Sequence, residues 1–218
     1  MEKLEKMGEF FNNRKNEYDE HQTTNVDSEN IFYPFTAQCL PTKENAEVLD
    51  LGCGTGLELE HYFKINPTAK ITGIDLADGM LDILKNKFPD KSLNLIVGSY
   101  FDIPFENEKF DCIVSVESLH HFTQAEKTQL YKKVFSALKQ GGYFLLTDYF
   151  ALSDEEESSL RKEYNAIKKE QNLAEDEFYH FDTPLTVEHE IQALKNGGFD
   201  NIEIIKTWSC TSVLKATK

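Results

Sequence analysis

Residues 48–56 read VLDLGCGTG, and this stretch decides the fold class of the chain. Apolar residues surround one acid, and glycines then occupy every second position. A short apolar run of this kind predicts a buried β-strand. Glycine permits a tight turn and lets a ligand approach the backbone closely. The stretch therefore predicts a strand that ends in a loop built to hold a ligand against its main chain.

On either side, short apolar runs alternate with longer helical patterns. Strands are predicted at 47–52, 70–75, 93–98, 110–116 and 143–150, and helices at 57–66, 78–88 and 124–139. Asp78 is a plausible N-cap of the second helix, and Gly141-Gly142 ends the third. After a helix at 186–197, strands at 201–207 and 210–217 are close enough for a hairpin. We therefore expect an α/β, Rossmann-like, mostly parallel sheet with an antiparallel edge strand and helices on both faces.

The length of 218 residues suits one domain with a sizeable core. Within it, residues 46–150 are expected to form a ligand-binding core, and residues 186–218 a helix followed by the hairpin. Residues 1–40 look helical and aromatic, and residues 151–185 look helical and acidic. These two segments are predicted either to pack as solvated helices or to form lids over the carboxyl ends of the strands, where ligands bind in such sheets.

Composition excludes several classes of protein. Apolar residues make up 40% of the chain, which is typical of globular proteins. No apolar run approaches the roughly 20 residues of a membrane span, and the N-terminus lacks the apolar core of a signal peptide, so a cytoplasmic protein is expected. The net charge of -15 makes nucleic acid an unlikely partner. The four cysteines form no CxxC pair, which favours reduced thiols over metal or disulfide use.

The glycine spacing and two acids limit the kinds of ligand that this loop is expected to bind. A dinucleotide loop needs G-x-G-x-x-G, and Leu57 stands where its third glycine belongs; the Gly-Lys-Ser/Thr of a phosphate loop is absent. Asp50, just before the glycines, would repel a phosphate but suits an ammonium group. Asp75, which closes the second strand, is placed to accept both hydroxyls of a ribose. An amino acid, a ribose and no phosphate together describe S-adenosylmethionine and disfavour NAD.

Four stretches in this order, VLDLGCGTG, GIDLADGML, DIPFENEKFDCIVSVESLHHF and LKQGGYFLLTDYF, resemble successive motifs of class I S-adenosylmethionine-dependent methyltransferases. The resemblance covers about residues 46–150. It implies a seven-stranded sheet whose last strand is antiparallel. It also implies that the methionine end of the cofactor lies on the first motif, in which Cys53 is a small filler. The residues that it assigns to that end are Asp50, Gly52, Gly54 and Gly56.

The same resemblance assigns Asp75 to the ribose and Leu76 to the adenine. Many relatives carry an acid directly after the glycine that ends the third strand, where it meets the adenine amino group. Here that position is Ser99, and the acid follows later as Asp102. Either residue is a candidate for reading the adenine, and Tyr100 is expected to add backbone or ring contacts.

Candidates for the transferring end lie after the fourth strand, where Glu117 is expected to contact the cofactor. His120 and His121 are candidate proton acceptors, or else residues that cap or pack the loop. A metal bound to the pair is not expected, because adjacent side chains diverge and no third ligand is evident. Tyr18 resembles a tyrosine that relatives place over the cofactor, and a role as a core aromatic is equally compatible. Aromatic and histidine side chains that could line an acceptor pocket are Phe32, Tyr33, Phe35, Tyr149, His180 and Phe181.

These features favour a methyltransferase for a small-molecule acceptor, working as a monomer or homodimer. A tRNA- or protein-modifying enzyme is the first alternative, although the sequence shows little of a basic face. The tail also resembles that of carboxy-S-adenosylmethionine synthases, which need a cation for an extra carboxylate. The only arginines of the chain are Arg14 and Arg161, and the sequence places neither of them at such a site. A cofactor-binding module without acceptor chemistry is the non-enzyme alternative.

Overall fold

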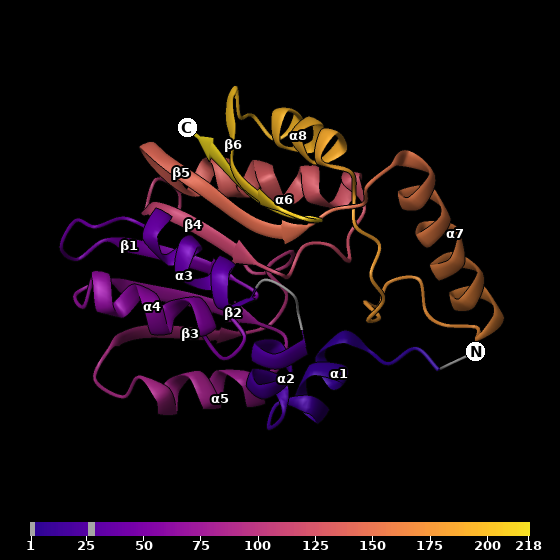
Figure 1. Cartoon of the computed structure of the whole chain (residues 1–218), viewed down its shortest axis with the longest axis horizontal. Coiled ribbons are helices and arrows are strands. Elements are labelled where there is room, and N and C mark those ends of the chain that lie inside the picture. The colour runs from indigo at the N-terminus through magenta and orange to yellow at the C-terminus, as the bar shows by residue number, and fades with distance from the viewer. Residues whose placement is uncertain (1–2, 26–28) are drawn as a thin grey trace.

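A computed structural model describes residues 3–25 and 29–218. Seven strands form one sheet in the order β3-β2-β1-β4-β5-β7-β6 (Figure 1). The strands are β1 (Glu47–Leu51), β2 (Lys70–Asp75), β3 (Ser92–Val97), β4 (Phe110–Val116), β5 (Leu138–Tyr149), β6 (Asn201–Trp208) and β7 (Thr211–Thr217). The predicted fold class is confirmed, including the antiparallel last strand, because β7 pairs antiparallel with both β5 and β6.

The order of the strands creates a crevice. From β1 the chain adds β2 and then β3 on one side, and it returns to add β4 and β5 on the other, all in parallel. The loops after β1 and β4 therefore leave the sheet in opposite directions. In open parallel sheets, ligands bind at such a switch point, outside the carboxyl ends of the strands.

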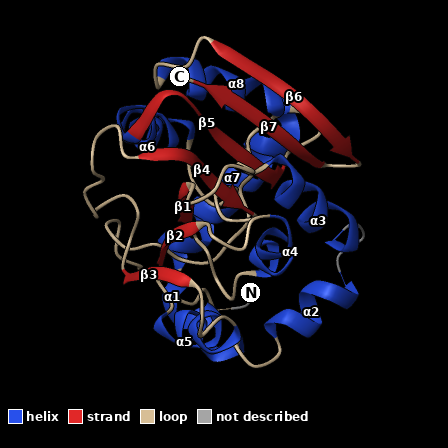
Figure 2. Cartoon of the chain, turned by 90° about the vertical axis from the view of Figure 1, so that its left-hand side faces the viewer, coloured by secondary structure: helices blue, strands red, loops and turns tan. Residues whose placement is uncertain are grey.

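Helices cover both faces of the sheet (Figure 2). They are α1 (Met7–Arg14), α2 (Tyr18–Asn25), α3 (Glu29–Cys39), α4 (Leu57–Ile65), α5 (Asp78–Lys87), α6 (Gln124–Ala137), α7 (Asp154–Glu170) and α8 (Val187–Asn196). Neighbouring residues of β1 show why both faces need cover. Val48 packs in one core with residues of α3 and α4, whereas Leu49 packs in a second core with residues of α6 and α8. Strands buried on both faces read as continuous apolar runs, as the sequence does here.

Several predicted ends differ from the structure by one or two residues, and β5 begins at Leu138 instead of at 143. Helix α6 ends at Ala137 and not at 139, because Leu138 already pairs with Phe110 as the first residue of β5. The N-cap of α5 is Ala77, whose backbone is extended, and Asp78 is the first helical residue. A carboxylate is favourable there too, because the first turn of a helix carries partial positive charge.

The N-terminal segment divides between two places in the molecule. Figure 1 shows α1 and α2 beside the carboxyl ends of the central strands, whereas α3 packs with α4. In α3, Phe32 is fully buried and Tyr33 is 6% exposed within the core on that face, and Phe35 packs edge-on against Trp208. Of the places that the sequence left open for these three aromatic residues, the core is therefore the one that they occupy, because α3 places them against the sheet. Within the described residues, no helix is both long enough and apolar enough to cross a membrane.

One buried ion pair fastens α6 to α8. The ammonium group of Lys127 donates to the carboxylate of Glu190, whose other oxygen accepts from Tyr131; Lys127 and Glu190 are 1% and 0% exposed. Removing one partner of such a pair leaves a buried charge uncompensated. We predict that Lys127→Met lowers the free energy of unfolding in urea by about 3–5 kcal/mol.

The double variant Lys127→Met/Glu190→Leu is the control for this prediction. It removes both charges, so we expect it to regain most of the lost stability. A single Lys127→Met variant as stable as the wild type would contradict the prediction.

Candidate active site

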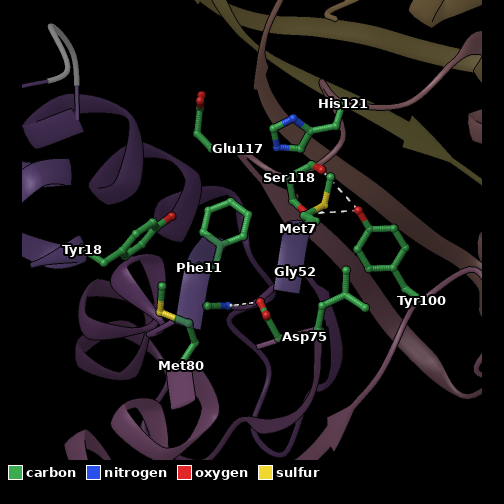
Figure 3. Close-up of a pocket in the computed structure, with 12 residues that line it drawn as sticks. Met7, Phe11, Tyr18, Gly52, Asp75, Met80, Tyr100, Glu117, Ser118 and His121 are labelled. Carbon is green, nitrogen blue, oxygen red and sulfur yellow. Dashed lines mark hydrogen bonds between the residues drawn. The ribbon is translucent and has the colours of Figure 1, made fainter. Parts of the chain in front are cut away.

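A cavity lies where the carboxyl ends of β1, β2 and β4 meet α1 and α2 (Figure 3). Its walls combine the glycine loop, the ends of three strands and side chains from the N-terminal helices. The lining residues are Met7, Phe11, Tyr18, Gly52, Gly54, Asp75, Leu76, Met80, Tyr100, Glu117, Ser118 and His121. Sequence reasoning named most of these and missed Met7, Phe11, Met80 and Ser118, because nothing local marks which helix covers a loop. We call this space the nucleoside cavity, after the ligand that the sequence predicts for it.

The glycine loop needs glycine at Gly52 and Gly54 for different reasons. Gly52 has φ +74°, and a Cβ there would lie 2.0 Å from the hydroxyl oxygen of Ser118. Gly54 has φ +47°, and a Cβ there would meet nothing within 4 Å. Left-handed φ values disfavour other residues at both positions. Gly52 therefore lets the loop that carries Ser118 pack against the backbone, and Gly54 leaves an open space that a ligand can fill.

Asp75 anchors the loop to the end of β2. Its carboxylate accepts hydrogen bonds from the backbone N–H groups of Gly54 at 2.9 Å and Ala77 at 2.8 Å. Burial raises its pKa above the ordinary value, although these backbone bonds oppose the change. Each carboxylate oxygen keeps a lone pair, since an ionised carboxylate offers about four acceptor sites. Asp75 can thus shape the loop and still accept ligand hydroxyls.

Asp50 and Glu58 form a buried acidic pair close to the loop. Asp50 is 1% exposed and Glu58 4%. The two carboxyl groups contact one another, and apart from this contact Oδ2 of Asp50 and Oε1 of Glu58 have no hydrogen-bond partner within the described part of the chain. Burial raises the pKa of both groups, and for Asp50 the neighbouring Glu58 raises it further. Such a region is stabilised by a cationic ligand nearby. An ammonium group and a sulfonium fit this environment, and a pyrophosphate does not.

A second, larger cavity of about 530 Å³ adjoins the first. Phe11, Tyr18, Glu117 and His121 line both. The other lining residues come from the N-terminal helices, the loop after β4, the end of β5, the turn between β6 and β7 and the segment after α7. They are Phe10, Arg14, Glu17, His21, Gln22, His120, Tyr149, His180, Asp182, Cys210 and Thr211. The volume suits a metabolite-sized molecule. We call this space the acceptor cavity.

Known proteins share both the sequence pattern and the fold of this chain. Residues 48–142 match the family model described as a methyltransferase domain. A candidate O-methyltransferase from Nostoc punctiforme has the same fold, with a TM-score of 0.71 at 21% identity over 99% of this chain and 62% of that one. Residues 48–142 therefore carry a methyltransferase domain, and the chain is similar in sequence and fold to the class I S-adenosylmethionine-dependent methyltransferases.

Curated relatives of the methyltransferase differ in their substrates. It is 33% identical over 116 residues to the tRNA (carboxymethyluridine(34)-5-O)-methyltransferase of Saccharomyces cerevisiae, over 52% of this chain and 39% of that protein. It is 26% identical over 222 residues to the carboxy-S-adenosyl-L-methionine synthase of Campylobacter lari, over 94% of this chain and 92% of that one. The chain thus spans less than two thirds of the yeast relative's length but nearly all of the Campylobacter relative's. S-adenosylmethionine is the cofactor that the family implies.

Three residues of the first motif that the sequence assigned to the cofactor site, Asp50, Cys53 and Gly56, lie outside the wall of the nucleoside cavity. Cys53 is 3% exposed, with its sulfur close to Gly73, as expected of a filler. Gly56 has φ +73°, and a Cβ there would lie 2.8 Å from a methyl group of Leu84. This glycine therefore lets the start of α4 approach α5. Direct contact of any of the three residues with the cofactor stays a prediction.

Of the three residues predicted to contact the adenine, one lines the nucleoside cavity and two do not. Tyr100 lines the nucleoside cavity of the methyltransferase, and its hydroxyl contacts the carbonyl oxygen and hydroxyl of Ser118 at 3.2 Å each. Ser99 and Asp102 do not line it; the hydroxyl of Ser99 accepts a hydrogen bond from the N–H of Phe101, and Asp102 is exposed. Which residue reads the adenine stays a prediction.

His120 and His121 lie together at the wall of the acceptor cavity. Their ring centroids are 4.0 Å apart, so the predicted divergence of the two side chains was wrong. Both rings face the carboxylate of Asp182, which lies 3.5 Å from Nε2 of His120 and 3.2 Å from Nδ1 of His121. Burial alone would lower the pKa of His120, but the carboxylates of Asp148 and Asp182 outweigh it and raise that pKa to about 10. Burial and the charge of His120 lower the pKa of His121.

Asp182 is the residue of this group that sequence reasoning missed. Its Oδ1 lies 3.5 Å from Nε2 of His120 and 3.2 Å from Nδ1 of His121. Burial raises its pKa, but the hydrogen bonds of both imidazoles outweigh this and hold the pKa well below its usual range. Nothing in the stretch YHFDTPLT marks Asp182 as a site residue. Its neighbour His180 lines the cavity as predicted, whereas Phe181 stacks on Tyr164 instead.

The segment that carries Asp182 is fastened to α1. Met7 N–H donates to the carbonyl of Phe178, His180 N–H donates to the carbonyl of Glu5, and the rings of His180 and Phe10 stack with their centroids 3.5 Å apart. Figure 1 shows this segment returning from α7 toward α1. The acceptor cavity is therefore walled in part by two pieces of chain that come from opposite halves of the sequence and contact one another.

Proposed function

We propose that this methyltransferase transfers the methyl group of S-adenosylmethionine to a small-molecule acceptor bound in the acceptor cavity. The observation that carries the proposal is the shared wall between the two cavities, made by Phe11, Tyr18, Glu117 and His121. The cofactor supplies an electrophilic methyl group. The protein aligns the acceptor with that group, and alignment alone accounts for much of the rate in such displacements.

The binding roles follow the walls of the nucleoside cavity. We propose that the glycine loop holds the methionine end and that Asp75 accepts the ribose hydroxyls, with Leu76 and Tyr100 beside the adenine. Asp50 does not line the cavity, and its proposed role is to supply negative charge for the ammonium group from behind the glycine loop. The residues proposed to contact the acceptor are His121, His120 and Tyr18, because all three line the acceptor cavity.

The charge of the chain supports a small acceptor over a tRNA. A chain with net charge -15 repels a phosphate backbone, which needs Lys and Arg contacts. The cavity is also walled by two separate segments that contact one another, α1 and residues 178–182, which suits a molecule that is enclosed. The yeast relative's tRNA substrate is therefore not carried over to this chain.

An assay with methyl-labelled S-adenosylmethionine tests the acceptor class. The enzyme is incubated with a metabolite extract, with total tRNA and with a protein extract, and Asp75→Ala serves as the inactive control. We expect label to leave the cofactor and appear in the metabolite fraction only. Label in tRNA or protein, at a level that Asp75→Ala abolishes, would refute a small-molecule acceptor.

A carboxy-S-adenosylmethionine synthase is the second candidate, favoured by the similarity along nearly the whole Campylobacter relative. The sequence alone did not place a cation for such an enzyme. The structure puts Arg14 in the wall of the acceptor cavity, where it also pairs with Glu5 at 2.8 Å and lies over the ring of Phe10. Mass spectrometry of the nucleoside that copurifies with the protein separates the candidates. A carboxylated nucleoside supports the synthase, and S-adenosylmethionine or S-adenosylhomocysteine supports the methyltransferase.

A further inference from the structure

Three donor side chains converge at the boundary between the loop after β4 and the segment after α7. One donor atom each from His120, His121 and Asp182 lies within 4.8 Å of the other two. No sequence motif links these residues, because α6 and α7 separate the histidines from Asp182 along the chain. We propose that His120, His121 and Asp182 bind a divalent transition-metal ion beside the acceptor cavity.

The distances match a coordination sphere. Oδ1 of Asp182 lies 3.5 Å from Nε2 of His120 and 3.2 Å from Nδ1 of His121. Around a tetrahedral Zn²⁺ with bonds of about 2.0–2.1 Å, two ligand atoms stand roughly 3.3–3.4 Å apart. The carboxylate oxygen thus lies at ligand spacing from both imidazole nitrogens, and the donor atoms of the group all lie within 4.8 Å of one another. Both distances exceed those of a close hydrogen bond between charged groups.

The surroundings of His120 are those of a metal ligand. Its other ring nitrogen, Nδ1, lies 2.6 Å from Oδ1 of Asp148, which is fully buried. Asp148 is itself held by the backbone N–H groups of Leu119 at 2.9 Å and Tyr149 at 3.0 Å. Metal-binding histidines almost always donate their second ring N–H to a carboxylate, a carbonyl or a water molecule, which fixes the ring and its tautomer. Asp148 provides that support and leaves Nε2 of His120 directed at Asp182.

The negative charge of the site and its opening to the acceptor cavity also favour a bound cation. Asp148 and Asp182 bring two carboxylates to a region where the side chains of His120 and His121 are only 8% and 3% exposed. The side chain of Asp182 is 48% exposed and lines the acceptor cavity, so an ion there keeps an open face. A competing contact exists at His121, whose Nδ1 also lies 3.2 Å from the carbonyl oxygen of Phe181. To bind the metal, Nδ1 of His121 must be unprotonated and direct its lone pair at the ion. The carbonyl oxygen of Phe181 then accepts a hydrogen bond from another donor.

Two imidazoles and one carboxylate suit Zn²⁺, Co²⁺, Mn²⁺ and Fe²⁺ rather than Ca²⁺ or Mg²⁺, which prefer oxygen ligands. The use of the ion rests on the proposed function. An acceptor oxygen on the open face would be oriented by the ion and would lose its proton more readily, because a bound cation stabilises the oxyanion. The histidines then act on the acceptor as ligands of the ion and not as proton acceptors. Binding of the ion itself does not depend on the acceptor.

Titration of chelator-treated protein with Co²⁺ and Zn²⁺ tests the site. We expect one Co²⁺ per chain with the visible spectrum of nitrogen and oxygen coordination, displaced by one Zn²⁺. Asp182→Asn and His121→Gln should each weaken Co²⁺ binding at least about 100-fold, and Asp148→Asn about 10- to 100-fold. The matched control is His189→Gln, which alters the surface group of Asp154, Glu157 and His189 and should change nothing at the proposed site.

Three results would overturn the proposal. They are the lack of a Co²⁺ spectrum, equal affinity in wild type and Asp182→Asn, and loss of binding in His189→Gln, which would mean an adventitious surface ion. Asp182 is half exposed, so its variant carries the test even where a histidine variant fails to fold. S-adenosylhomocysteine binding is measured on the same samples. A protein that binds the nucleoside but no metal refutes this inference and leaves the proposed function standing.

Discussion

Replacing Asp75 with alanine should weaken the binding of S-adenosylhomocysteine about 100-fold or more, measured by isothermal titration. Two hydrogen bonds from ribose hydroxyls to a carboxylate contribute about 1.5–3 kcal/mol each, and alanine removes both. The carboxylate also holds the N–H groups of Gly54 and Ala77, so its loss loosens the glycine loop as well. Both effects reduce affinity for the nucleoside.

The controls separate binding from folding. Asp78→Ala removes an exposed acid a few positions further along and should leave the affinity unchanged. Asp75→Asn keeps one acceptor oxygen and should give an intermediate affinity. Thermal unfolding shows whether each variant is folded at the temperature of titration. A folded Asp75→Ala protein with wild-type affinity would mean that the ribose lies elsewhere, and the nucleoside cavity would lose its assignment.

Alanine at Gly52 and at Gly54 should have different dominant effects. At Gly52 the new Cβ would lie 2.0 Å from the Ser118 hydroxyl at φ +74°, so we expect a loss of about 3 kcal/mol in unfolding free energy. At Gly54 the Cβ has room, and only backbone strain of about 1 kcal/mol is expected. That methyl group stands in the nucleoside cavity, however, and should lower S-adenosylhomocysteine affinity at least about 10-fold.

Gly141→Ala is the matched control for Gly54→Ala. Gly141 also has a left-handed φ, +77°, and a Cβ there would likewise meet nothing within 4 Å, but it does not line the nucleoside cavity. It should share the small loss of stability and keep full affinity. Ser118→Gly combined with Gly52→Ala should recover part of the stability, since it removes the clash but not the backbone strain. Equal affinities of the Gly54→Ala and Gly141→Ala proteins would show that the loop does not touch the nucleoside.

Much of the nucleoside cavity was predictable because its residues sit at fixed places in a repeated pattern. The glycines follow β1 directly, and Asp75 ends β2, so the parallel sheet itself brings them together. The pattern also indicated that helices cover both faces of the sheet, since the strands are continuous apolar runs. Among the elements, errors fell at helix ends such as that of α6, where pairing between Leu138 and Phe110 replaced a last helical turn.

The acceptor cavity was predictable only in part. His120 and His121 stood out as a pair, but the carboxylates that hold their rings, Asp148 and Asp182, come from distant parts of the chain. Phe32 and Tyr33 looked like pocket residues because aromatic side chains suit both a pocket and a core. Only the packing of α3 on the sheet decided between these places.

The sequence by itself determined the sheet, the glycine loop and the acids at the ends of β1 and β2, because short-range periodicity and turn chemistry act between neighbours in the chain. The tertiary structure decided which side chains face the acceptor. The contact of α1 with residues 178–182 brings Asp182 to the histidines, and that contact joins the first helix to a segment beyond α7. No local pattern encodes such a meeting, since it depends on how whole elements pack.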